Sequence, residues 1–157
     1  MSTRIYRGIF VVMTAFLLLL VTSCEKELST ETAKVKPPVR TYIVTARADK
    51  KGTNSTSPGT AILKGIYDEG TKQFSYSIEY SDVSPRTISL RSGPKGTAGT
   101  FVKELYNSTS DTEITIRGSF LLTPLQERSM LKGLWSIAVN TPVMAPEISG
   151  FLTFKQQ

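Results

Sequence analysis

The sequence contains no histidine and only one cysteine among its 157 residues. Without histidine, the chain cannot form a Ser-His-Asp or Cys-His arrangement for nucleophilic catalysis. It also lacks the commonest side-chain ligand of transition metals. The single cysteine, Cys24, leaves no partner for a disulfide within the chain. The formal net charge of +6 is spread along the sequence, and such a mild excess does not indicate binding to nucleic acid.

Long apolar runs are equally scarce, and the one present lies near the amino terminus. It covers residues 9–21 (IFVVMTAFLLLLV) and follows Arg4 and Arg7. Spanning a bilayer takes about 20 apolar residues, so this run fits the apolar region of a signal peptide. The next residues, Val21-Thr22-Ser23-Cys24, resemble the lipobox of bacterial lipoproteins, where a peptidase cuts before the cysteine. Residues 1–23 are therefore predicted to be a lipoprotein signal peptide.

Cys24 is accordingly the predicted lipid-attachment site, because a thiol forms a stable thioether to diacylglycerol. Each buried CH₂ contributes about 0.8 kcal/mol to membrane binding, so two or three acyl chains, such as palmitate, anchor a protein firmly. The alternatives are an ordinary secretory signal and an uncleaved membrane helix, with a cysteine there by chance. We expect the protein in the cell envelope, anchored by lipid to the outer membrane, on its periplasmic face or on the cell surface.

Residues 25–40 (EKELSTETAKVKPPVR) consist mainly of charged and small polar residues. They contain too few apolar side chains to offset the entropy lost on ordering. Residues 24–40 are therefore predicted to be a lipidated cysteine and a flexible tether, ending in a short stiff polyproline piece. Residues 41–157 are predicted to form a single folded domain.

From residue 41 onward, short strands alternate with turn residues. The strictest alternation covers residues 74–80, where Phe74, Tyr76 and Tyr80 share one face, as in a half-buried strand. Further strands are predicted at residues 42–46, 60–67, 87–91, 100–105, 113–120, 134–140 and 148–154. The predicted fold class is all-β, an antiparallel β-sandwich or barrel, immunoglobulin-like or similar, with one short helix.

The helix is predicted over residues 123–133. Thr123 is a suitable N-cap, Pro124 takes the first helical position, and Gln126 can complete a capping box. Gly133 suits the position after the helix, where the chain turns left-handed. The apolar side of this helix is predicted to consist of Leu125, Met130 and Leu131.

An ordered series of motifs runs through residues 41–154. It includes the strand pair 61–65 and 74–80, a glycine-rich loop at 93–99 and the capped helix. Its most specific part is Ile137-Ala138-Val139-Asn140-Thr141, followed by Pro146-Glu147-Ile148-Ser149-Gly150. This series resembles the CHRD domain, a module named after chordin and found in many bacterial exported proteins. The resemblance implies a CHRD-like β-sandwich over residues 41–157.

The chain departs from that family at polar signature positions. Thr87 and Ser89 stand where the family often has paired histidines, Asn140 replaces a later histidine, and Ser149 replaces an arginine. The signature positions that we follow are Thr87, Ser89, Asn140, Thr141, Glu147 and Gly150. Because the lone carboxylate of Glu147 cannot form a transition-metal site, we expect it to hydrogen-bond the loop around Thr141. We expect no metal and no cofactor.

No motif in the sequence predicts catalysis. The segment Gly93-Pro94-Lys95-Gly96 precedes a strand instead of opening a helix, so it predicts a turn and not a phosphate loop. The acidic residues at 68–69, 111 and 113 lie in or beside predicted turns and indicate solvated charges. The aromatic residues of strand 74–80 and Trp135 could line a binding face, but their spacing favours the core.

Three classes of function remain open. The first is a non-catalytic, membrane-anchored binding or adhesion module that contacts a protein or a glycan, and not nucleic acid. The alternative is a structural accessory subunit of a cell-envelope complex. An enzyme is the third class, and we do not expect the protein to be one. A flat, exposed apolar or aromatic patch would favour the first two classes, whereas a cleft with converging acids would favour an enzyme.

Overall fold

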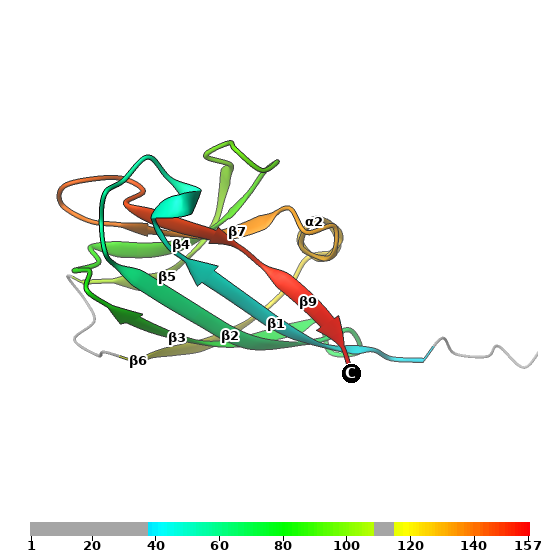
Figure 1. Ribbon diagram of the computed structural model, residues 1–157. Helices are drawn as coiled ribbons and strands as arrows, with labels where there is room; N and C mark the ends of the chain where they lie inside the picture. The colour runs from blue at the N-terminus through cyan, green and yellow to red at the C-terminus, as the bar shows by residue number, and fades with distance from the viewer. Residues whose placement is uncertain (1–37, 109–114) are drawn as a thin grey trace, which may run out of the picture. The chain divides into compact units, whose positions relative to one another are not determined.

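Two antiparallel β-sheets form the fold in the computed structural model, which describes residues 38–108 and 115–157 (Figure 1). The strands are β1 (Thr41–Ala48), β2 (Thr60–Asp68), β3 (Gln73–Ser81), β4 (Thr87–Ser92), β5 (Thr100–Asn107), β6 (Thr115–Leu121), β7 (Trp135–Asn140), β8 (Ile148–Phe151) and β9 (Thr153–Gln156). One sheet has the order β6-β3-β2-β1-β9 and the other β5-β4-β7-β8.

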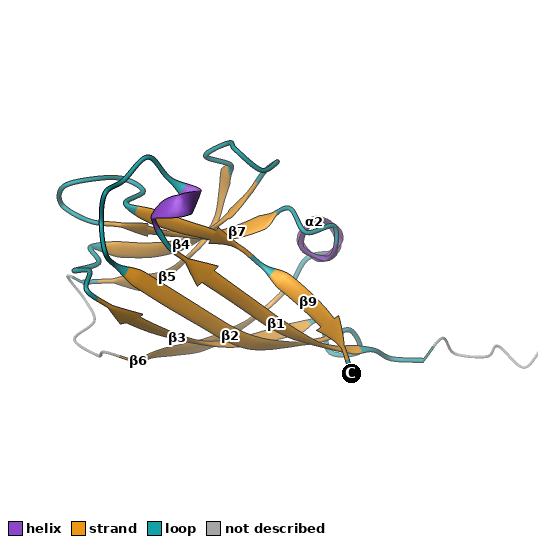
Figure 2. Ribbon diagram, viewed as in Figure 1, coloured by secondary structure: helices purple, strands orange, loops and turns teal. Residues whose placement is uncertain are grey.

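These sheets confirm the predicted all-β, sandwich-like class. Among the described residues, the helical elements are a single turn, η1 (Lys50–Gly52), and the short helix α2 (Pro124–Leu131) (Figure 2). The predicted signal peptide, the lipid site Cys24 and the tether up to residue 37 lie outside the described residues. Arg40, one residue before the predicted domain boundary, already contacts the turn after β2, because its carbonyl accepts a hydrogen bond from Glu69 N–H at 2.9 Å.

Strand alternation determines which side chains reach the core. Across the β2–β3 pair, Leu63 lies opposite Ile78 and Tyr67 lies opposite Phe74. Successive residues of a strand point to opposite faces, so these four side chains share one face, and all four are fully buried. The strands predicted from period-two patterns therefore pair in registers that place their apolar side chains on the buried face.

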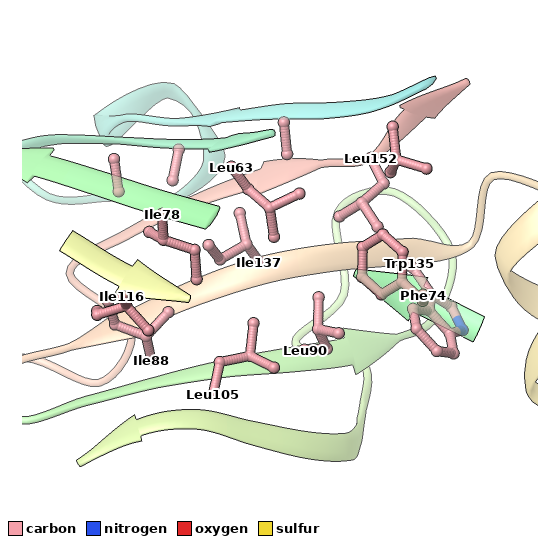
Figure 3. Close-up of a cluster of buried hydrophobic side chains, with 14 of the residues drawn as sticks. Leu63, Phe74, Ile78, Ile88, Leu90, Leu105, Ile116, Trp135, Ile137 and Leu152 are labelled. Carbon is pink, nitrogen blue, oxygen red and sulfur yellow. The ribbon is translucent and has the colours of Figure 1, made fainter. Parts of the chain in front are cut away.

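The core lies between the two sheets, which both contribute side chains (Figure 3). Trp135 is fully buried, and its indole Nε1 donates a hydrogen bond to Ser129 Oγ at 2.8 Å. Phe74 is also fully buried, while Tyr76 and Tyr80 are half-buried and pack against the same cluster. The prediction that these aromatic residues belong to the core is confirmed.

The prediction of one strand at residues 148–154 is wrong, because this segment forms β8 and β9 in different sheets. β8 pairs with β7, and β9 pairs with β1. The buried Leu152 lies between them, and its N–H donates to the carbonyl of Trp135 at 2.9 Å. Ile148, Leu152 and Phe154 all contribute to the core, so their alternation continues across the junction and gives no sign of the change of sheet.

Gly150 allows β8 to lie against β1 at this crossing. A Cβ atom at residue 150 would overlap the carbonyl oxygen of Arg47. Beside it, Asp49 and Ser149 exchange two backbone hydrogen bonds of 3.2 Å each. The glycine is needed here for close approach of two backbones.

Helix α2 begins as predicted. Thr123 Oγ1 accepts from the Gln126 N–H at 3.3 Å, and Gln126 Oε1 accepts from the Thr123 N–H at 2.9 Å, which completes the capping box. Gly133 has a φ of +72° after the C-cap. Met130 is buried, but Leu125 is 76% exposed, so its predicted place on the apolar side is wrong. Five residues along a helix turn the side chain by about 140°, which directs Leu125 away from the core when Met130 is buried.

Glu127 ties α2 to the β2–β3 hairpin. Its Oε1 accepts hydrogen bonds from Tyr67 Oη at 2.6 Å and from Lys72 Nζ at 2.8 Å. Burial raises the pKa of Glu127, but hydrogen bonds from Lys72 and Tyr67 and the charge of Lys72 outweigh this, so the pKa lies below its usual value. Burial, followed by the bond to Glu127, raises the pKa of Tyr67.

We expect the Glu127 contact to make stability depend on pH. Because the folded state lowers this pKa, the ionised carboxylate stabilises the fold above the unfolded-state pKa, and this is lost as pH falls through the folded-state pKa. Glu127→Gln should reduce the free energy of unfolding by about 1–3 kcal/mol near neutral pH and weaken its acid dependence. Urea unfolding from neutral pH to about pH 3 measures both. The exposed Glu79→Gln is the control, and equal curves for the two variants would contradict the expectation.

Candidate functional site

A groove of about 480 Å³ lies on the outer face of the four-stranded sheet, a volume typical of ligand sites. Its floor is formed by Arg91 of β4, Ser136 and Ala138 of β7, and Ser149 and Phe151 of β8. Its walls are the loop segments 51–54, 96–98 and 144–146. The first wall, which includes the end of η1, and the second, at the tip of the β4–β5 hairpin, both stand above the sheet (Figure 1).

Hydrogen bonds hold the first wall against the floor. Ser149 Oγ donates to the carbonyl of Gly52 at 2.8 Å, and Thr53 Oγ1 donates to the carbonyl of Glu147 at 2.7 Å. A Cβ atom at residue 52 would overlap Ser149, so a glycine is needed for this close approach. The wall formed by residues 51–54 is therefore fixed to β8 and to the loop before it.

Thr141 and Glu147 organise the third wall. Thr141 Oγ1 accepts from two backbone N–H groups of its own loop, each at 3.2 Å, and donates to the Glu147 carboxylate at 2.5 Å. Hydrogen bonds from Ser57 and Thr141 lower the pKa of Glu147. The hydrogen bond predicted between Glu147 and the loop around Thr141 is thus present, and it closes the loop that forms the third wall.

The remaining polar signature positions lie on this same face of the sheet. Asn140 is the β7 neighbour of Thr87, and its side-chain amide donates to Thr87 Oγ1 at 3.0 Å. Ser89 is the neighbour of Ala138 in the groove floor. It is only 4% exposed, and its hydroxyl has no hydrogen-bond partner in the described part of the chain. Gly150, in contrast, faces β1.

Arg91 is the central cation of the groove, and the sequence analysis did not single it out. Its Nε donates to the carbonyl of Ala98 at 2.5 Å, and its Nη2 donates to that of Gly99 at 3.0 Å. These two bonds orient the guanidinium and leave three of its five N–H groups for a ligand. The sequence places it two residues after Ser89, on the face of β4 opposite the apolar side chains, but any outward-facing residue of a strand shares that pattern.

The charge around the groove is positive. Lys51 lines it together with Arg91, and Lys95 Nζ lies 5.9 Å from the centre of the Phe151 ring. No aspartate or glutamate of residues 38–108 and 115–157 lines the groove. Salt bridges within those ranges join Arg47 to Asp49 and Lys72 to Glu127, so the charge of Arg91 has no acidic partner there.

Of the acidic residues considered in the sequence, the structure describes Asp68 and Glu69 at the end of β2. Asp68 Oδ1 accepts from the N–H groups of Gly70 and Thr71, at 2.7 and 3.1 Å, and so stabilises the β2–β3 turn. Residues 111 and 113 lie outside the described residues. The segment 93–96 lies in the hairpin between β4 and β5, as predicted for a turn.

A second hollow, shallow and partly apolar, lies on the outer face of the five-stranded sheet. Ile43 and Ile66 are neighbours across β1 and β2, and both side chains are exposed. Their surroundings carry hydroxyl groups, among them the hydrogen-bonded pair Thr45 and Thr153. Two exposed isoleucines among polar side chains are ordinary on a protein surface, so this hollow does not distinguish between the classes of function.

In the described ranges, no group of three or more His, Cys, Asp or Glu side chains is placed to hold a metal ion. None of the helices in those ranges is long and apolar enough to cross a membrane. Comparisons with protein-family models, with curated proteins and with solved structures find no match to the chain. The resemblance to the CHRD domain therefore stays a prediction from the sequence.

Proposed function

We propose that this protein is a lipid-anchored, exported binding module whose ligand occupies the groove above β4, β7 and β8. The observation that carries the proposal is Arg91, a half-buried guanidinium held by two backbone carbonyls in a groove without acidic lining residues. Loops placed on a rigid sheet are a common way to build binding sites. The ligand is a protein or a glycan of the cell envelope or its surroundings.

The anchoring part of the proposal rests on the sequence around Cys24. A signal peptide over residues 1–23 and lipid on Cys24 would hold the protein at the outer membrane, on its periplasmic face or at the cell surface. The tether would then let the groove reach ligands away from the bilayer.

Cys24→Ser tests the anchor, because serine has no thiol for the thioether. We expect this variant to keep residues 1–23 and to carry no acyl chains, and the amino-terminal peptide of the wild type to begin at Cys24 and to carry acyl chains by mass spectrometry. Thr22→Ala, which keeps a small residue before the cysteine, is the control and should give the same amino-terminal peptide as the wild type. A wild-type protein that retains residues 1–23 and carries no acyl chains would favour an uncleaved membrane helix.

Membranes from cells that express the wild-type protein test the binding function. Crosslinking, followed by purification of this protein, should capture a bound protein or glycan, and Arg91→Gln should reduce the amount captured. A partner recovered in constant ratio, with no effect of Arg91→Gln, would favour a structural accessory subunit instead.

A further inference from the structure

The lining of the groove indicates the chemical class of its ligand. We propose that the groove binds an acidic oligosaccharide, whose carboxylate or sulfate group is held by Arg91 and Lys51. Its sugar hydroxyls would contact the hydroxyl and amide side chains of the walls and floor. This inference rests on the proposed function, since it takes the groove as the ligand site.

The anionic group is selected by the two cations. A guanidinium presents its N–H groups as a planar fork that matches a carboxylate or sulfate with two parallel hydrogen bonds. The carbonyls of Ala98 and Gly99 already orient the fork of Arg91, so little side-chain entropy is lost on binding. The side chain of Lys51 makes no hydrogen bond or salt bridge to another described residue and is therefore available to the same anion.

Sugar hydroxyls both donate and accept hydrogen bonds, so they pair best with side chains that do the same. The groove offers such groups on its floor and on one wall, namely Ser136 and Asn54. The hydroxyls of Thr53, Thr97 and Ser149 donate to backbone carbonyls and offer a ligand their oxygen as an acceptor. The half-buried ring of Phe151 lies at the same floor and provides an apolar surface for the C–H face of a sugar ring. A small anion bound at Arg91 would be too short to contact all of these groups.

The sheet geometry favours a sugar over an acidic peptide. Extended peptides commonly bind by adding a strand to a free sheet edge. The middle of the groove floor is β4 and β7, and each has neighbours on both sides in the order β5-β4-β7-β8. Their backbone groups are engaged in the sheet, so the floor recognises a ligand through side chains.

Isothermal titration calorimetry on the full-length protein in a non-ionic detergent tests the inference. The probes are oligogalacturonate for the carboxylate, heparin-derived oligosaccharide for the sulfate, a neutral maltooligosaccharide and poly-L-glutamate. At least one acidic sugar should bind, and the neutral one should not. Arg91→Gln should weaken binding about 10- to 100-fold, since it removes hydrogen bonds to a charged group. Added salt should weaken binding as well.

Matched variants separate the groove from general charge effects. Arg117→Gln removes one positive charge from an exposed position on β6 and should leave affinity within about twofold, because exposed charges beyond a Debye length are screened. Since Arg91 also holds the hairpin, Lys51→Gln is the second groove variant, and it should weaken binding without lowering the unfolding temperature.

Three results would overturn the inference. One is no binding of either acidic sugar at low salt. Another is unchanged affinity in both Arg91→Gln and Lys51→Gln. The last is tighter binding of poly-L-glutamate with the same dependence on Arg91, which would assign the groove to acidic peptides. If crosslinked capture from membranes still depends on Arg91 while acidic sugars fail to bind, the binding function stands and only the ligand class is wrong.

Discussion

Replacing Trp135 with alanine is expected to reduce the free energy of unfolding by about 3–5 kcal/mol. The indole is fully buried among side chains from both sheets (Figure 3). Its removal would leave a large cavity and would also leave Ser129 Oγ without the indole donor. Domains of this size are typically stable by about 5–15 kcal/mol in total, so the variant would lie near the limit of folding.

The loss of stability in Trp135→Ala is best measured by urea unfolding followed by far-ultraviolet circular dichroism. Fluorescence cannot be used, because Trp135 is the only tryptophan of the chain and the variant lacks it. Trp135→Phe retains an aromatic ring and should cost less than the alanine variant. Leu125→Ala is the control at an exposed leucine and should change stability by less than about 0.5 kcal/mol. A similarly small effect of Trp135→Ala would contradict the packing seen in the core.

Gly150→Ala is expected to have an effect of similar size through the backbone. A methyl group at this position would overlap the carbonyl oxygen of Arg47 in β1. Backbone atoms held in two sheets cannot move aside as the end of a side chain can, so β8 and β1 would have to separate. We expect a loss of about 3 kcal/mol or more, or failure to fold.

Gly133→Ala is a matched control for Gly150→Ala. Gly133 has a positive φ of +72°, but no atom lies within 4 Å of the Cβ position. Alanine there should cost only about 1–2 kcal/mol, the usual penalty of the left-handed conformation. Thermal and urea unfolding of both variants compares the two costs directly. A smaller loss for Gly150→Ala than for Gly133→Ala would show that β8 does not press against β1.

Gly150→Ala should also affect the groove. Ser149, next to Gly150, holds the wall at Gly52 through a 2.8 Å hydrogen bond. If Gly150→Ala folds at all, displacement of β8 should move this wall and weaken any binding in the groove. The crossing of β8 over β1 therefore connects the stability of the sandwich to the shape of the candidate site.

Much of the fold could be predicted from the sequence, because its signals are local. Period-two alternation at residues 74–80 identified β3 and its buried face, and Thr123 with Gln126 identified the start of α2 through contacts three residues apart. Neither signal needs knowledge of distant parts of the chain. The position of Leu125 shows the limit of such reasoning, since burial of Met130 decides which side of the helix faces outward.

The candidate site could be predicted only in part. The sequence singled out Thr87, Asn140, Thr141 and Glu147, and it correctly expected Glu147 to hydrogen-bond the loop around Thr141. It missed Arg91, because an arginine on an alternating strand has no distinctive pattern until hairpin carbonyls and loop walls surround it. The contacts that build the groove join residues about a hundred positions apart, such as Ser149 with Gly52, and no sequence period records them.

The sequence by itself determined the strand pattern, the capped helix and the expectation of a lipid on Cys24, because each depends on neighbouring residues. Tertiary structure alone decided the switch of the chain at Leu152 from one sheet to the other, the need for glycine at position 150 and the positive groove around Arg91. These features arise where distant segments meet, and the physical reason is that steric overlap, hydrogen bonding and uncompensated charge depend on position in space.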